Sequence, residues 1–143
     1  MTKLTLDHAN TIIASALSHA AAGGLRPLTV AVLDDGGHLV AFQRQDKSPI
    51  MRPQVAMGKA WGALAMGRSS RGLATLAAER PAFVSALVSA SDGRMIPVPG
   101  GVLIRNAAGD TMGAVGISGD TSDKDEEAAV AGIKAAGLMP GLE

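Results

Sequence analysis

The sequence contains no cysteine and no tyrosine, and aromatic residues make up only 2% of it. The absence of cysteine excludes disulfides, thiolate-bound iron–sulfur clusters, a cysteine nucleophile and covalent c-type haem attachment. The scarcity of aromatic rings removes the stacking platform that single-stranded nucleic acids use. Charge is balanced, with 13 basic and 13 acidic residues and a formal net charge of +0. Without a basic excess, we expect no nucleic-acid partner.

Long apolar runs are also absent, and none approaches the length of a membrane span. The first eight residues lack the apolar core of a signal peptide. We therefore expect a cytoplasmic protein with no membrane partner. The chain has 143 residues, of which 47% are hydrophobic and 18% charged, so it can bury a sizeable core. This composition predicts a single domain over residues 1–143.

The most informative stretch is 100–120, which predicts two strands joined by a tight turn. Two apolar runs, at 102–104 and 112–118, flank a segment rich in turn formers. Gly113 and Gly116 interrupt the second run, and glycine inside a strand usually marks a bulge or a close backbone approach. We therefore expect 112–118 to be a central strand, beneath a helix or beside a ligand.

Periodicity and turn residues predict the other elements. Asp34–Gly37 predicts a hairpin turn, and Thr5 is expected to cap the first helix. Ser48 followed by Pro49 is a common helix start, although Pro53 either moves that start to about Arg52 or distorts the first turn. The expected helices are 5–22, 52–67, 73–78 and 122–136, the expected strands are 28–33, 38–44 and 94–98, and a further apolar segment spans 81–88.

Basic residues on the second helix are candidates for ligand binding. Arg52 and Lys59 are seven residues apart and project from about the same face. They form either a solvated basic face or a paired cationic grip on a carboxylate or propionate. Gly58 and Gly62 leave a low-relief stripe on the same helix, where another backbone can pack closely.

Histidine is the other residue type with candidate site chemistry. His8 and His19 lie beside the apolar stripe of the first helix; they are either partly exposed or one of them reaches a ligand or metal. His38 lies at a strand start beside the turn, a position more typical of a solvent-facing residue than of a ligand. Four acidic residues near the last helix suit the helix N-terminus better than a hard cation, and these are Asp120, Asp123, Asp125 and Glu126.

Taken in order, these motifs resemble the GlcG/HbpS-like family of small haem-binding proteins, which includes the C-terminal domain of PduO-type proteins. The resemblance covers nearly the whole chain. It implies an α/β fold, namely a profilin-like α/β/α sandwich with a central antiparallel sheet of about five strands flanked by helices. It also implies homo-oligomers. The matching motifs are 30–46, Gly58-Lys59-Ala60, 99–102, 113–119 and Asp125-Glu126.

The function that this resemblance implies is a haem- or tetrapyrrole-binding accessory protein with a link to a catabolic pathway. Without cysteine or tyrosine, an axial haem ligand would come from a histidine, a methionine or a weaker oxygen donor. The expected metal ligands are His8 and His19, and the expected ligand-binding residues are Arg52, Lys59, Arg94 and His38.

Two alternative functions stay open. The first is a cofactor-independent isomerase, tautomerase or lyase, in which Arg52, Lys59 or Arg94 orients a small organic acid while a histidine or aspartate moves a proton. The second is an oligomeric structural protein without a ligand, in which the glycines and basic residues serve packing and surface roles. The sequence leaves open whether the protein is an enzyme.

Overall fold

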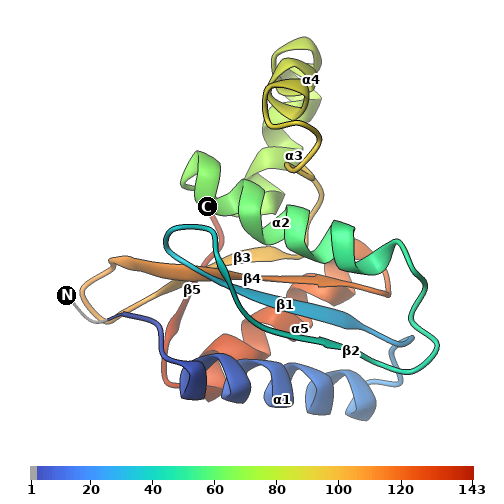
Figure 1. The fold of residues 1–143 in the computed structure, drawn as a ribbon, viewed down its shortest axis with the longest axis vertical. Coiled ribbons are helices and arrows are strands. Elements are labelled where there is room, and N and C mark those ends of the chain that lie inside the picture. Colours follow the sequence, from blue (N-terminus) through green and yellow to red (C-terminus); the bar gives the residue numbers. More distant parts are fainter. Residues whose placement is uncertain (1–2) are drawn as a thin grey trace.

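A five-stranded antiparallel sheet forms the middle of the molecule, with the strand order β2-β1-β4-β3-β5. The computed structural model describes residues 3–143. Figure 1 shows the arrangement of the elements. In chain order they are α1 (Leu6–Ala22), β1 (Thr29–Asp34), β2 (Leu39–Arg44), α2 (Arg52–Met66), α3 (Ser70–Glu79), α4 (Pro81–Ala90), β3 (Gly101–Arg105), β4 (Thr111–Ser118), α5 (Ser122–Ala135) and β5 (Met139–Gly141).

Helices cover both faces of this sheet. Helices α1 and α5 lie side by side against one face, and α2 crosses the other (Figure 1). The main core fills the space between the sheet and α1/α5, where Ile12 and Ile13 meet Val30, Val115 and other fully buried side chains. The predicted α/β/α sandwich with an antiparallel sheet of about five strands is confirmed.

Strand β4 is the central strand, as its glycines predicted. Seven of its eight residues are buried, and it lies directly beneath α2 (Figure 1). A Cβ at Gly116 would overlap the carbonyl oxygen of Ala56 on α2, and a Cβ at Gly113 would overlap that of Leu33 on β1. Both glycines are therefore required by close backbone approach.

Local signals set the first helix and the first turn. The Thr5 hydroxyl accepts a hydrogen bond from the His8 amide at 3.0 Å, and His8 Nδ1 accepts one from the Thr5 amide at 3.3 Å. This reciprocal capping box starts α1. In the β1–β2 turn, Asp34 Oδ1 accepts hydrogen bonds from the Gly36 and His38 amides, both at 3.0 Å. Both predictions are confirmed.

Other boundaries differ from the prediction. Residues 94–98 are not a strand, because Pro97 and Pro99 withhold amide donors and the Ile96 amide donates to the Gly58 carbonyl on α2 at 3.2 Å. The expected helix cap Ser48 is buried instead, with its hydroxyl 2.7 Å from that of Thr29. Helix α2 begins at Arg52, the later of the two starts that the sequence allowed. Strand β5 was not predicted.

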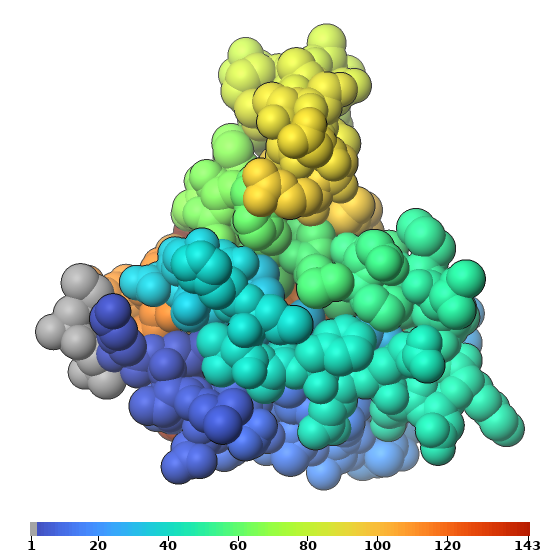
Figure 2. Space-filling model, in the orientation of Figure 1, coloured from blue at the N-terminus to red at the C-terminus, as the bar shows by residue number. Residues whose placement is uncertain are grey.

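The apolar segment 81–88 is helical and forms α4, which projects from the body with α3 (Figures 1 and 2). Val84 is the only residue of α4 that is buried in this chain. Phe83 remains 38% exposed, with the Arg80 guanidinium 4.1 Å from its ring centroid. Among residues 3–143, no helix has the length and apolar character needed to cross a bilayer.

Candidate functional site

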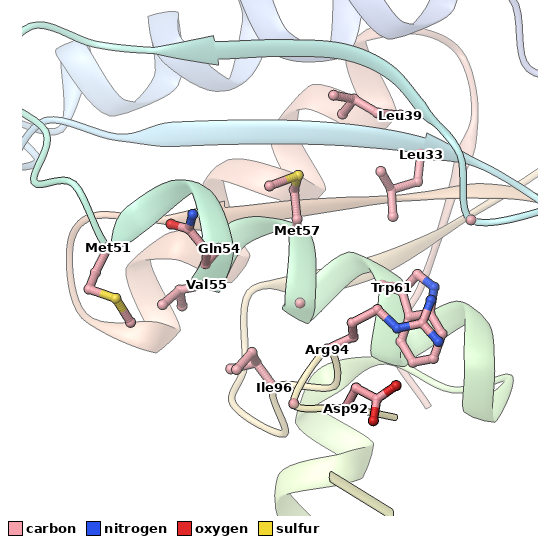
Figure 3. Close-up of a pocket in the computed structure, with 13 residues that line it drawn as sticks. Leu33, Leu39, Met51, Gln54, Val55, Met57, Trp61, Asp92, Arg94 and Ile96 are labelled. Carbon is pink, nitrogen blue, oxygen red and sulfur yellow. The ribbon is translucent and has the colours of Figure 1, made fainter. Parts of the chain in front are cut away.

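A pocket of about 550 Å³ lies where three parts of the chain meet. The β1–β2 hairpin, α2 and the segment after α4 form its walls (Figure 3). Its volume falls within the range of roughly 300–1,000 Å³ that is usual for small-molecule sites. The lining residues are mostly apolar and comprise Leu33, Gly37, Leu39, Met51, Gln54, Val55, Met57, Gly58, Trp61, Asp92, Gly93, Arg94 and Ile96.

Glycines on α2 position one wall of the pocket. A Cβ at Gly58 would lie only 2.7 Å from the Arg94 carbonyl oxygen and would overlap the Ile96 side chain. A Cβ at Gly62 would lie 2.7 Å from Met95 Cγ. Residues 94–96 therefore pack against the predicted Gly58–Gly62 stripe of α2. This close packing places Arg94 at the pocket.

Arg94 is held in place before any ligand arrives. Its guanidinium carbon lies 4.1 Å from the centroid of the Trp61 ring, a cation–π geometry. Its Nε donates to the Ser91 carbonyl at 3.1 Å. Within residues 3–143 no carboxylate forms an ion pair with Arg94. The terminal nitrogens can therefore meet a ligand carboxylate at little cost in side-chain entropy.

The other polar groups of the pocket are few. Asp92 lies on the same wall as Arg94, and Gln54 lies on α2 (Figure 3). Met51 and Met57 bring two thioethers to the lining, and thioether sulfur is an established haem ligand. Apolar walls with a small number of charged or coordinating groups are typical of sites for amphipathic ligands.

His38 lies at the rim rather than in the lining. It stands between two lining residues, Gly37 and Leu39, and its side chain is 80% exposed. Its Nδ1 lies 3.2 Å from Asp34 Oδ1. The predicted solvent-facing character matches this exposure, and its position keeps it within the same region as Arg94.

Lys59 faces away from this pocket. Its side chain is only 3% exposed, and its Nζ donates to the Ile117 carbonyl at 2.8 Å and lies 3.2 Å from Asp125 Oδ2. Burial lowers the pKa of the Lys59 amine, while the Asp125 carboxylate raises it in part. Burial likewise raises the pKa of Asp125, against the opposing effect of the lysine. Lys59 thus joins α2 to β4 and α5.

Arg52 shares the face of α2 that carries Lys59, as its spacing predicted. Its Nη1 donates to the Ser118 hydroxyl at 3.0 Å, at the end of β4. Neither residue lines the pocket. The basic face is therefore neither fully solvated nor a paired grip at this site, because β4 and α5 occupy it.

His8 and His19 lie on α1, across the sheet from α2 and the pocket (Figure 1). His8 is engaged in the capping box, and His19 is exposed. The structure therefore does not bring them together with Arg94. Residues 3–143 contain no group of three or more histidine, cysteine, aspartate or glutamate side chains placed to hold a metal ion.

The acidic residues near α5 pair with basic side chains. Arg71 on α3 bonds to Asp123 and Glu126, Arg26 Nε lies 3.7 Å from Asp120 Oδ2, and Asp125 pairs with Lys59. The Thr121 hydroxyl caps α5 by accepting from the Lys124 amide at 3.3 Å, and Asp123 and Asp125 lie in the first turn of the helix, where the dipole favours acidic groups.

Several pocket residues escaped the sequence prediction, namely Met51, Met57, Trp61 and Asp92. The glycine stripe on α2 was one available signal, because a close approach implied that another segment packs on that helix. The single tryptophan, three positions after Gly58, was a second. Neither signal identified the segment that would complete the wall.

Comparisons with known proteins identify the family. The sequence model described as "Haem degrading protein HbpS-like" matches residues 4–134. No curated protein matches the chain. The structure of a double mutant of HbpS from Streptomyces reticuli is 27% identical and superposes with a TM-score of 0.80, covering 94% of this chain and 87% of the other.

Two further solved structures share the fold at lower identity. The PduOC:heme complex is 24% identical with a TM-score of 0.86, covering 96% of this chain and 97% of the other. The ORFY protein of Klebsiella pneumoniae is 22% identical with a TM-score of 0.86, covering 96% and 93%. Because the family match spans nearly all of the described residues, the chain belongs to the HbpS-like family.

Proposed function

We propose that this protein binds haem or a related tetrapyrrole in the pocket between the β1–β2 hairpin, α2 and residues 92–96. The observation that carries the proposal is Arg94, a guanidinium stacked on Trp61, fixed by the Ser91 carbonyl and, among residues 3–143, free of a carboxylate partner. A cation preorganised at the edge of an apolar pocket suits a flat apolar ligand with acid groups. Family membership and the haem in the PduOC complex support the same ligand class.

The residues present fit such a ligand. Arg94 would hold a propionate, and the Trp61 ring with Leu33 and Ile96 would pack against the tetrapyrrole. Met51, Met57 or His38 would supply an axial donor, since these are the side chains of suitable chemistry in the lining or at its rim. Bound haem would supply an iron centre for redox or oxygen chemistry. A link to a catabolic pathway and a cytoplasmic location remain predictions.

The test is a visible-absorbance titration of the purified protein with haemin. We expect a saturable, near-stoichiometric shift of the Soret band in the wild type, and roughly tenfold weaker binding in Arg94→Ala, because charge-assisted hydrogen bonds are lost. Arg80→Ala is the matched control: Arg80 also stacks on an aromatic ring at 4.1 Å, but it lies outside the pocket. Non-saturating binding, or equal losses in both variants, would contradict the proposal.

The axial ligand is identified in the same titration. Met51→Leu, Met57→Leu and His38→Ala each remove one donor. We expect all three to fold, because Met-to-Leu changes conserve volume and the His38 side chain is exposed. Loss of the axial ligand alters the position of the Soret band. His8→Ala and His19→Ala serve as controls from the opposite side of the sheet. If the spectrum changes only in His8→Ala or His19→Ala, haem binds near α1 and not in the pocket.

A second candidate is proton transfer on a small organic acid. One observation favours it: Asp92 and Arg94 share a pocket wall, so a base and a carboxylate-binding cation lie in one site. A thermal-shift screen of small organic acids tests it. Stabilisation by such an acid that disappears in Arg94→Ala, together with no saturable haemin binding, would favour this candidate.

We also infer that the chain forms homo-oligomers. In the single chain Pro81, Ala82, Phe83 and Ala86 of α4 are exposed, and exposed apolar surface on a projecting helix is a place where a partner can bind.

A further inference from the structure

Among residues 3–143, four helices end in the same backbone motif. After α1, α2, α4 and α5, one residue donates its amide to the carbonyl three residues back, and the next residue donates to the carbonyl five residues back. These two bonds form a Schellman motif, whose left-handed residue is usually glycine because a Cβ is strained there. The left-handed residues are Gly24, Gly67, Asp92 and Gly137, with φ values of 65°, 68°, 56° and 75°.

Asp92 is the exception among the four, and local bonding does not explain it. Aspartate tolerates this conformation best when its short side chain bonds to nearby backbone. Within residues 3–143, the Asp92 carboxylate makes no hydrogen bond and no ion pair, while its neighbours Ser91 and Arg94 do. The three helices that end in glycine form the same two backbone hydrogen bonds, so the motif does not require a carboxylate.

What distinguishes Asp92 is its place in the fold. Gly24, Gly67 and Gly137 lie outside the pocket lining, whereas Asp92 is part of it (Figure 3). Its carboxylate and the Arg94 guanidinium are opposite charges two residues apart on one wall, yet they do not pair with each other. Each charge is therefore free to contact a ligand at the same end of the pocket.

We propose that Asp92 is a specificity residue of the pocket, and that the ligand presents a hydrogen-bond donor beside the acid group that Arg94 binds. The left-handed aspartate is kept at some cost in stability because its carboxylate accepts that donor. This inference rests on the proposed tetrapyrrole function and names the form of the ligand.

The chemistry of tetrapyrroles separates two forms. In haem every ring nitrogen is bound to iron, so the ring offers no N–H donor. An open-chain tetrapyrrole has N–H groups as well as acid side chains. The presence of both Arg94 and Asp92 in the lining therefore favours an open-chain tetrapyrrole over haem, because the Asp92 carboxylate gains no hydrogen bond from a ligand that has no donor.

The experiment compares haemin with biliverdin in titrations of the wild type, Asp92→Asn and Asp92→Gly. We expect both variants to bind biliverdin roughly tenfold more weakly, because a charge-assisted hydrogen bond is lost. Haemin should bind no more weakly than in the wild type, because a negative charge is removed from the wall that receives its propionates. Asp92→Gly should also raise the melting temperature of the free protein by about 2–5 °C, because the backbone strain is relieved.

The matched control is Gly137→Asp, which places aspartate in the same motif at the end of α5, where a Cβ meets no atom within 4 Å. It should lower the melting temperature and leave biliverdin binding unchanged. Biliverdin binding that is equal in the wild type and both Asp92 variants would overturn this inference alone, provided that haemin binding still depends on Arg94. A wild type that binds neither compound would overturn the tetrapyrrole function as well.

Discussion

Lys59 and Asp125 form an ion pair in the interior of the protein, where neither side chain is more than 3% exposed. The Asp125 carboxylate also accepts hydrogen bonds from the Gly119 amide at 3.3 Å and the Asp120 amide at 2.9 Å. It therefore holds the loop between β4 and α5 as well as the lysine. Burial opposes the charged form of both partners, so each depends on the other to remain ionised.

Removal of one partner should be costly. We expect Asp125→Ala to lower the free energy of unfolding by about 3–5 kcal/mol, because it leaves the buried Lys59 amine without its counter-charge and two loop amides without their acceptor. The double variant Lys59→Met/Asp125→Leu should recover part of that loss, since no buried charge remains. Urea unfolding measures both.

The surface ion pairs of Arg71 provide the control. Arg71 bonds to Glu126 and Asp123, but its side chain is 44% exposed. Arg71→Ala should therefore cost less than about 1 kcal/mol. A loss in Asp125→Ala no larger than that in Arg71→Ala would show that the buried pair is not a structural anchor.

Among the elements, α2 and β4 depend most closely on each other. Gly116 faces α2, and a Cβ there would overlap the Ala56 carbonyl oxygen and lie 3.0 Å from the Ala60 amide. These are backbone atoms of a helix, so they cannot give way as a flexible side chain would. The close contact lets α2 lie near enough to the sheet for Lys59 to reach the Ile117 carbonyl.

Gly116→Ala should therefore separate the two elements. We expect the free energy of unfolding to fall by about 3 kcal/mol, at the upper end of the cost of overpacking, as measured by urea denaturation. The matched control is Gly36→Ala, where the added Cβ meets the exposed imidazole of His38, at 2.9 Å, and the Asp34 carboxylate. If both variants lose the same stability, the close approach of α2 to β4 is not a requirement of the fold.

At the scale of the whole molecule, the projecting helices α3 and α4 give the chain a shape unlike a compact sandwich (Figure 2). Pro81, Ala82, Phe83 and Ala86 of α4 are exposed in the single chain. Burial of apolar surface of this kind stabilises association by about 25 cal/mol per Å² before the costs of association are deducted. The exposed face of α4 is therefore where association in solution should be tested.

We expect Ala86→Arg to reduce the molar mass measured by size-exclusion chromatography with light scattering. Arginine preserves helix propensity and leaves the buried Val84 untouched, so α4 should still form. Ala14→Arg, on the exposed face of α1, is the control and should leave the mass unchanged. A wild type with the mass of a single chain would contradict the expected homo-oligomer.

Local patterns were sufficient for most elements, for physical reasons that act over a few residues. The Thr5 cap and the Asp34–Gly37 turn depend on hydrogen bonds and φ values within one segment. The apolar runs of β1, β3 and β4 follow from residue type along the chain. The prediction failed at 94–98, where the partner of the extended chain is α2 rather than a strand. Periodicity describes the segment itself and does not name what packs against it.

The site depended on contacts between distant segments. Spacing showed that Arg52 and Lys59 share a helix face, but only packing against β4 and α5 turned that face into a buried ion pair rather than a ligand grip. Similarly, Arg94 was a candidate from the chain alone, while its stacking on Trp61 arises because Gly58 and Gly62 admit residues 94–96. Residue type determines the chemistry that each side chain can perform, and this can be read from the sequence. Which side chains face one ligand is decided by tertiary packing, because the elements that pack on a helix determine which of its faces is buried and which lines a pocket.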